Sequence, residues 1–261
     1  MPQNDAPDAA PRRAQPRRWL QPLRLVYTLY AATVFMTLAL GSLPLLVMLP
    51  ALGTRRRLTR WVGRCVLTLM GMPLRVRFCG PLPDPCIVVA NHCSYLDGVV
   101  LTAALPPRFG FVIKREMSSV PLAGLLLTRI GSHFVARDNR AGSARDALRL
   151  MRSAARGRSL AFFPEGTFGP DPGLLRFHTG AFAAADRAGM PVVPLVIRGT
   201  RHCLPPETFL ARPGRIEVQM LEPMLPQPGR RDGAAALRDA ARAAILAALS
   251  AGSRSPRASR E

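Results

Sequence analysis

A histidine and an aspartate stand five residues apart in the segment NHCSYLD at 91–97, directly after the apolar run CIVVA at 86–90. At a turn from a strand into a helix, the carboxylate can accept one imidazole N–H, fix the tautomer and stabilise the imidazolium. The other ring nitrogen can then take a proton from a hydroxyl group. His92 and Asp97 therefore predict general-base chemistry. A structural histidine, and an aspartate placed in the first turn of a helix, are the plainer alternatives.

Two further polar loops follow apolar runs of the same kind. The turn PEGT at 164–167 follows SLAFF at 159–163, and it brings together a carboxylate, a hydroxyl and a glycine that permits close backbone approach. Lys114 and Arg115 follow FGFVI at 109–113, and two cations at a strand end can hold a phosphate. An ordinary turn and a solvated charged edge are the alternatives for these two loops.

The elements that must position these loops alternate along the chain. Short apolar runs alternate with helical stretches, which predicts an α/β fold with a mixed, largely parallel sheet flanked by helices. Ligands of open α/β sheets bind outside the carboxyl ends of the strands, so the three loops are expected at one edge. The predicted strands are 74–78, 86–90, 109–113, 132–136, 159–163, 192–197 and 215–220, and the predicted helices are 95–105, 120–130, 141–156, 180–188 and 233–250.

Two details of this pattern predict local packing. Pro194 lies inside the predicted strand 192–197, which indicates an edge strand or a bulge because proline lacks the N–H of the ladder. In the predicted helix 141–156, the spacing places Ala144, Leu148 and Met151 on one face.

A long apolar segment precedes the alternating region. Residues 25–52 hold no charge, and about 20 apolar residues suffice to cross a bilayer. The run is too long for a signal peptide and no cleavage site follows it. Gly41, Pro44 and Pro50 interrupt its second half, and arginines flank it on both sides, which fits a re-entrant hairpin as well as a span. The segment therefore predicts membrane attachment and leaves its mode open.

The composition divides the chain into four parts. We expect a disordered basic N-terminus at 1–24, a membrane-associated helical segment at 25–72, a catalytic domain at 73–250 and a disordered basic tail at 251–261. Within the second part, the mixed segment 54–72 carries arginines and large apolar residues, as interfacial amphipathic helices do.

The net charge of +20 calls for an anionic partner. Anionic membrane lipids and phosphorylated small molecules fit it. Nucleic acid is not expected, because the arginines are spread along the chain without interleaved aromatics or a helix-turn-helix pattern. The five cysteines form no C-x-x-C pair, which predicts reduced thiols and no metal site.

Four blocks occur in order at the predicted strand ends: NHCSYLD, IKREMSSVPLAG, FFPEGT and VVPLVIRGT. In this order they resemble the glycerolipid acyltransferase family of the PlsC (1-acyl-sn-glycerol-3-phosphate acyltransferase) type, over roughly residues 74–220. The resemblance implies direct attack of a lysophospholipid hydroxyl on the thioester of acyl-CoA or acyl-carrier protein, without cofactor or metal. It implies a location at the cytoplasmic face of the bacterial inner membrane.

The resemblance also implies residue roles. His92 would be the general base and Asp97 would orient it. Glu165, Gly166 and Thr167 would shape the acceptor site, Lys114 and Arg115 would hold phosphate, and Pro194 would lie near the acyl chain. Cys93 invites a covalent alternative that the family does not need. The implied substrate-binding residues are Asn91, Ser94, Lys114, Arg115, Glu165, Gly166, Thr167, Arg176 and Pro194.

One position departs from the family pattern. The third block usually continues with an arginine, whereas Phe168 stands here, and an aromatic ring cannot bind phosphate bidentately. Arg176 or Arg201 would have to supply the charge. We expect 1-acyl-sn-glycerol-3-phosphate as the acceptor, giving phosphatidic acid, and otherwise a different lysolipid, such as an amino-acid-derived one. A thioesterase, a catalytically silent lipid-binding homologue and a nucleic-acid-binding membrane anchor are the remaining alternatives.

Overall fold

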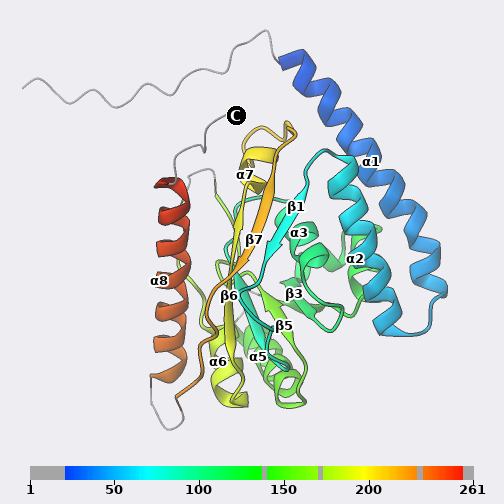
Figure 1. Cartoon of the computed structure of the whole chain (residues 1–261). Helices are drawn as coiled ribbons and strands as arrows, with labels where there is room; N and C mark the ends of the chain where they lie inside the picture. The colour runs from blue at the N-terminus through cyan, green and yellow to red at the C-terminus, as the bar shows by residue number, and fades with distance from the viewer. Residues whose placement is uncertain (1–20, 137–139, 170–172, 228–231, 255–261) are drawn as a thin grey trace, which may run out of the picture.

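Seven strands form one sheet in the computed structural model, which describes residues 21–136, 140–169, 173–227 and 232–254 (Figure 1). The strand order is β1-β7-β6-β2-β5-β3-β4. All neighbouring strands pair in parallel except β6 and β7, which are antiparallel, so the sheet is mixed and largely parallel as predicted. The strands are β1 (Leu74–Arg77), β2 (Ile87–Ala90), β3 (Gly110–Lys114), β4 (His133–Val135), β5 (Leu160–Phe162), β6 (Val192–Arg198) and β7 (Ile216–Met220).

Helices cover both faces of this sheet, which is why its central strands are apolar throughout. Alternate residues of β2 point to opposite faces: Val88 and Ala90 pack with α2 and α3, whereas Ile87 and Val89 pack with α5, α6 and α8. Figure 1 shows α1 and α2 on one side of the sheet and α8 on the other. The helices are α1 (Gln21–Met48), α2 (Leu52–Leu69), α3 (Asp97–Ala104), α4 (Ala123–Arg129), α5 (Arg140–Ala155), α6 (Gly180–Ala188), α7 (Thr200–Cys203) and α8 (Gly233–Arg254), with a 3₁₀ turn η2 (Arg115–Ser118).

The chain changes direction between the two central strands β2 and β5. It leaves β2 through α3 to reach β3 on one side, and it leaves β5 through α6 to reach β6 on the other. α3 and α6 lie on opposite faces of the sheet. Loops that part in this way open a crevice at the carboxyl ends of the strands, where α/β proteins bind their ligands.

Pro194 lies in a central strand, so the edge-strand alternative was wrong. β6 pairs with β2 on one side and with β7 on the other. The bulge alternative is correct: Val192 pairs with Met224 and Leu195 with Met220, so the partner segment has one residue more. The Pro194 carbonyl accepts the N–H of Leu221 at this bulge, so the proline faces the irregular side of the strand and leaves pairing with β2 intact.

The predicted face of α5 is confirmed in part: Met151 packs against the buried core, whereas Leu148 does not. Leu148 is exposed, whereas Leu150 and Ala154 are buried. Asp146 is buried as well and pairs with Arg115 from the turn after β3. This ion pair joins the buried side of α5 to the turn after β3.

The N-terminal region is a hairpin of two helices. α1 continues without a break through Gly41 and Pro44, and α2 packs along it after the connection at 49–51. The hydroxyl groups of Tyr27 and Tyr30 donate to the carbonyls of Met70 and Leu69, where α2 ends. α1 alone is long and apolar enough to cross a bilayer among the described helices, and the side chains of its apolar window are mostly exposed.

The predicted boundaries at the two ends shift slightly. α1 begins at Gln21, so residues 21–24 of the expected disordered N-terminus are helical, and 1–20 lie outside the described residues. α8 extends to Arg254, so the first residues of the expected tail are helical, and 255–261 lie outside the described residues.

Candidate active site

His92 and Asp97 form a hydrogen-bonded pair at the carboxyl end of β2. His92 lies in the loop after the strand, Asp97 is the first residue of α3, and Nδ1 is 2.8 Å from Oδ2. The same carboxylate oxygen accepts the backbone N–H groups of Cys93 at 2.7 Å and Ser94 at 2.8 Å. The aspartate side chain is fully buried and the histidine is 19% exposed. Asp97 thus fixes the imidazole through Nδ1 and leaves Nε2 free of this contact.

Glu165 holds the same loop from the neighbouring strand. β2 and β5 are parallel, with Val89 opposite Phe162, so residues three positions further along each chain meet beyond the sheet. Glu165 Oε1 accepts the His92 backbone N–H at 2.6 Å, and Oε2 accepts the Leu175 N–H at 2.7 Å. Burial raises the pKa of Glu165, and the two N–H groups act against this rise. The carboxylate therefore positions His92, and its predicted contact with the acceptor stays a prediction.

The loop after β5 covers the imidazole with aromatic rings. Gly166 has a φ of +75°, which a side chain would strain, and its N–H closes a turn onto the Phe163 carbonyl at 3.1 Å. Phe163 stacks on His92 with ring centroids 4.2 Å apart, and Phe168 meets it edge-on at 4.5 Å. Thr167 is exposed beside them. Motif spacing alone did not reveal this sandwich of the histidine.

Asn91 and Ser94 use their side chains on the protein backbone. Asn91 Nδ2 donates to the Ile197 carbonyl at 3.0 Å, and its Oδ1 accepts the Ile197 N–H at 2.7 Å, which extends the pairing of β2 with β6. Ser94 Oγ donates to the Leu204 carbonyl at 2.8 Å. Both residues are buried and fix the shape of the His92 loop. Their predicted contacts with substrate stay untested.

The predicted phosphate-binding cations are each close to a carboxylate. Arg115 Nη2 lies 2.6 Å from the buried Asp146, and Lys114 Nζ lies 3.8 Å from Glu116. Both stand at the end of β3, one strand beyond β5. Of the other implied binders, Arg176 is exposed and lowers, after Arg238, the pKa of Asp239 in α8, and Pro194 is buried in β6.

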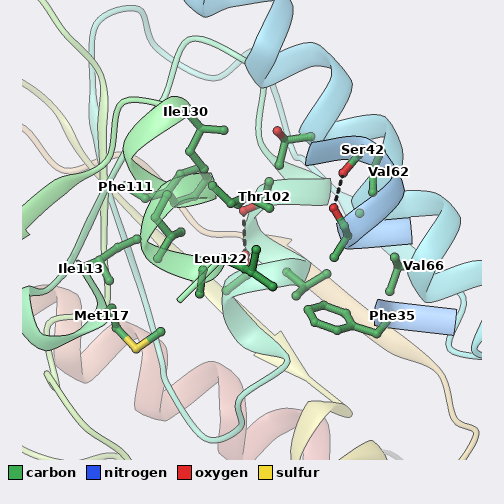
Figure 2. A pocket seen from close by; sticks show the side chains of 18 of the residues that line it. Phe35, Ser42, Val62, Val66, Thr102, Phe111, Ile113, Met117, Leu122 and Ile130 are labelled. Atoms are coloured by element: carbon green, nitrogen blue, oxygen red, sulfur yellow. Dashed lines mark hydrogen bonds between the residues drawn. The ribbon is translucent and has the colours of Figure 1, made fainter. Parts of the chain in front are cut away.

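An apolar cavity of about 420 Å³ lies beside this site, between the helical hairpin and the sheet (Figure 2). Its walls come from α1, α2, α3, β3 and α4, with Phe35, Val62 and Phe111 among the lining side chains. Phe163 and Tyr95 line the cavity, and Phe163 also stacks on His92, so one aromatic ring joins the cavity wall to the imidazole. These lining residues carry no distinct signal in the sequence, because cavity walls and a packed core use the same apolar residue types.

Comparison with known proteins places this site in a family. The acyltransferase family model matches residues 75–198, which include His92, Asp97 and Glu165. A lyso-ornithine lipid O-acyltransferase from Pseudomonas aeruginosa is 36% identical over 214 residues, covering 74% of this chain and 79% of that protein. The chain belongs to the glycerolipid acyltransferase family.

A second relative and a solved structure support the assignment of this chain to the acyltransferase family. A 1-acyl-sn-glycerol-3-phosphate acyltransferase from Limnanthes alba is 30% identical over 200 residues, covering 74% of this chain and 70% of that one. The crystal structure of PlsC from Thermotoga maritima has the same fold, with a TM-score of 0.72 at 22% identity, covering 92% of this chain and 99% of that one. The protein is thus an enzyme of lysophospholipid or acylglycerol-phosphate acyltransferase type.

Cys93 is poorly suited to be the nucleophile of this acyltransferase. Burial and the neighbouring Asp97 raise the pKa of its thiol to about 12, so the reactive thiolate is scarce at neutral pH. Its Sγ lies 3.4 Å from Thr200 Oγ1. We therefore expect Cys93→Ala to keep kcat/KM within about threefold of wild type, measured with an acyl-CoA and a lysolipid. A loss comparable to that of a histidine knockout would indicate an acyl-cysteine intermediate.

Proposed function

We propose that this acyltransferase moves a fatty acyl group from acyl-CoA or acyl-carrier protein directly to the free hydroxyl of a lysolipid, with His92 as the general base. The observation that carries the proposal is the 2.8 Å contact between His92 Nδ1 and the buried Asp97 carboxylate, which fixes the ring beside an apolar cavity. No cofactor enters this scheme.

The proposed transfer accounts for every proton that moves and every bond that forms or breaks. Nε2 of His92 takes the proton of the acceptor hydroxyl as its oxygen attacks the thioester carbonyl, and Asp97 stabilises the imidazolium. The new C–O ester bond forms, the C–S bond breaks, and the imidazolium returns the proton to the leaving thiolate. The products are the diacylated lipid and free CoA or carrier-protein thiol.

The apolar cavity is suited to an acyl chain, because each methylene buried there contributes about 0.8 kcal/mol. Ala39 on α1 lines it, whereas Ala32 on the same helix is exposed and does not. We expect Ala39→Phe to lower kcat/KM for a long-chain acyl-CoA about tenfold while a short-chain donor keeps its value. Ala32→Phe is the matched control and should change neither. Equal chain-length profiles for the two variants would place the acyl chain elsewhere.

Membrane attachment is proposed through α1 and α2. α1 exposes large apolar side chains such as Leu25 and Leu29. Near the start of α2, Arg57 is exposed, whereas the two arginines before it bond backbone carbonyls. An anionic surface binds an exposed arginine by about 1 kcal/mol. The cytoplasmic face of a bacterial inner membrane is the proposed location, since it holds anionic lipids and keeps cysteines reduced.

This attachment has a direct test. Replacing both Leu25 and Leu29 with glutamate should move most of the protein from the pelleted membrane to the soluble fraction after a salt wash. Leu246→Glu on α8, which is also exposed, should leave pelleting unchanged. If the double variant still pellets like wild type, α1 is not the anchor.

The acceptor is proposed to be a lysolipid, and the resemblance and several relatives support 1-acyl-sn-glycerol-3-phosphate as one candidate. The 36% identity to a lyso-ornithine lipid O-acyltransferase favours a second candidate, lyso-ornithine lipid. The test is acylation of lysophosphatidic acid, lysophosphatidylglycerol, lyso-ornithine lipid and glycerol 3-phosphate, from labelled acyl-CoA and acyl-carrier protein. Donor turnover without any acceptor would indicate a thioesterase instead.

A further inference from the structure

Three aromatic side chains form a rim beside His92, and we call Tyr95, Phe168 and Phe209 the aromatic rim. Phe168 lies edge-on to Tyr95 at 4.8 Å, and Tyr95 stacks on Phe209 at 5.3 Å. Tyr95 is 55% exposed and Phe209 is 58% exposed, although both are large and apolar. Because Phe168 also touches the His92 ring, an acceptor that reaches His92 from this side lies against the rim.

An ion pair stands next to the rim. Arg201 on α7 donates through Nη1 to the Gly169 carbonyl at 3.0 Å, adjacent to Phe168, and pairs through Nη2 with Glu207 Oε1. The backbone of Arg201 bonds the thiol of Cys93, the neighbour of His92. Arg201 and Glu207 are both partly exposed, so solvent and a ligand can reach them. We call them the rim ion pair.

The charges at this edge favour a zwitterion over a phosphate monoester. Lys114, Arg115 and Arg201 each have a carboxylate partner, in Glu116, Asp146 and Glu207. A monoester carries a charge near −2, and Glu207 would repel it where Phe168 offers no guanidinium fork. A head group with one carboxylate and one ammonium matches both members of the rim ion pair, and an ammonium is also attracted to aromatic faces.

We infer that the acceptor is a lysolipid with a zwitterionic amino-acid head group, and that Phe168, Arg201 and Glu207 determine this specificity. The carboxylate accepts hydrogen bonds from Arg201, and the ammonium lies between Glu207 and the aromatic rim. The inference rests on the proposed function, because it concerns the acceptor of the same transfer. The inference explains why Phe168 stands where the family motif usually has an arginine: the aromatic ring takes part in recognition of the head group.

The test compares lyso-ornithine lipid with lysophosphatidic acid as acceptors, with one acyl-CoA, in micelles of a nonionic detergent. Wild-type kcat/KM should favour lyso-ornithine lipid by at least about tenfold. Phe168→Arg should shift the ratio towards lysophosphatidic acid about tenfold, and Phe168→Tyr should preserve it within about threefold. Glu207→Gln should lower kcat/KM for lyso-ornithine lipid about tenfold without lowering it for lysophosphatidic acid. The ratio of the two kcat/KM values measured on one variant does not change when a substitution disturbs His92 equally for both acceptors.

Leu225→Arg is the matched control for added charge. Leu225 is exposed and follows Met224, which pairs with Val192 at the amino end of β6, the opposite end from the His92 loop. This variant should leave the ratio unchanged.

Two outcomes would overturn the inference. Wild-type enzyme that acylates lysophosphatidic acid as well as or better than lyso-ornithine lipid refutes it and leaves the proposed function standing; this measurement needs no variant to fold. Absence of transfer to both acceptors, and to lysophosphatidylglycerol and glycerol 3-phosphate, from acyl-CoA and acyl-carrier protein refutes the proposed function and the inference with it.

Discussion

His92→Ala should abolish detectable acyl transfer, with kcat falling by roughly 100- to 10,000-fold, the usual contribution of a general base. The imidazole is fixed by Asp97 through Nδ1 and by rings on two sides, so a water molecule in its place would lack both its basicity and its position. The KM for acyl-CoA should change little, because the acyl chain is proposed to bind in the cavity. Initial rates at saturating donor, with the preferred lysolipid, measure the effect.

The fold should survive this substitution. The Glu165 carboxylate accepts the backbone N–H of residue 92, which alanine retains. The loops after β2 and β5 therefore stay joined in the variant. His178→Ala serves as a control, because His178 is exposed and uses its backbone N–H on the Pro164 carbonyl. A His92→Ala enzyme with more than about one hundredth of wild-type activity would show that another group removes the proton.

The sheet could be predicted because its central strands are buried on both faces. Runs such as 86–90 and 192–197 are apolar almost throughout, and each is followed by a loop that carries one of the motifs. The pair His92 and Asp97 could be predicted because both residues belong to one short loop, where sequence distance limits spatial distance. Their contact at 2.8 Å follows from the geometry of a strand-to-helix turn.

The roles of Glu165 and Arg115 could not be predicted from the sequence, because they depend on partners elsewhere in the chain. Glu165 looks like a substrate ligand in its motif, yet both its oxygens accept backbone N–H groups, 73 residues and 10 residues away. Arg115 looks like a phosphate ligand, yet the buried Asp146 of α5 pairs with it. Neither pairing leaves a periodic or local signal, since the partners come from separate elements that meet only in the folded chain.

Asp97→Asn should lower kcat by about 100-fold or more while the protein stays folded. An asparagine carbonyl can still accept the N–H groups of Cys93 and Ser94, which hold the loop. It removes the negative charge that stabilises the imidazolium formed when His92 takes a proton. In a comparable histidine–aspartate pair of serine proteases, this loss costs about 10⁴ in kcat. Steady-state rates and thermal unfolding should be measured on the same preparation.

Asp97→Ala separates the charge of Asp97 from its hydrogen bonds. Alanine leaves two buried N–H groups without an acceptor, which costs about 1–3 kcal/mol for each unsatisfied group. We therefore expect Asp97→Ala to lose both activity and stability, and Asp97→Asn to lose activity while the unfolding temperature stays near wild type. If Asp97→Asn keeps more than about a tenth of wild-type kcat, then Asp97 acts only by shaping the loop. The proton transfer would then depend on the position of His92 rather than on a charged partner.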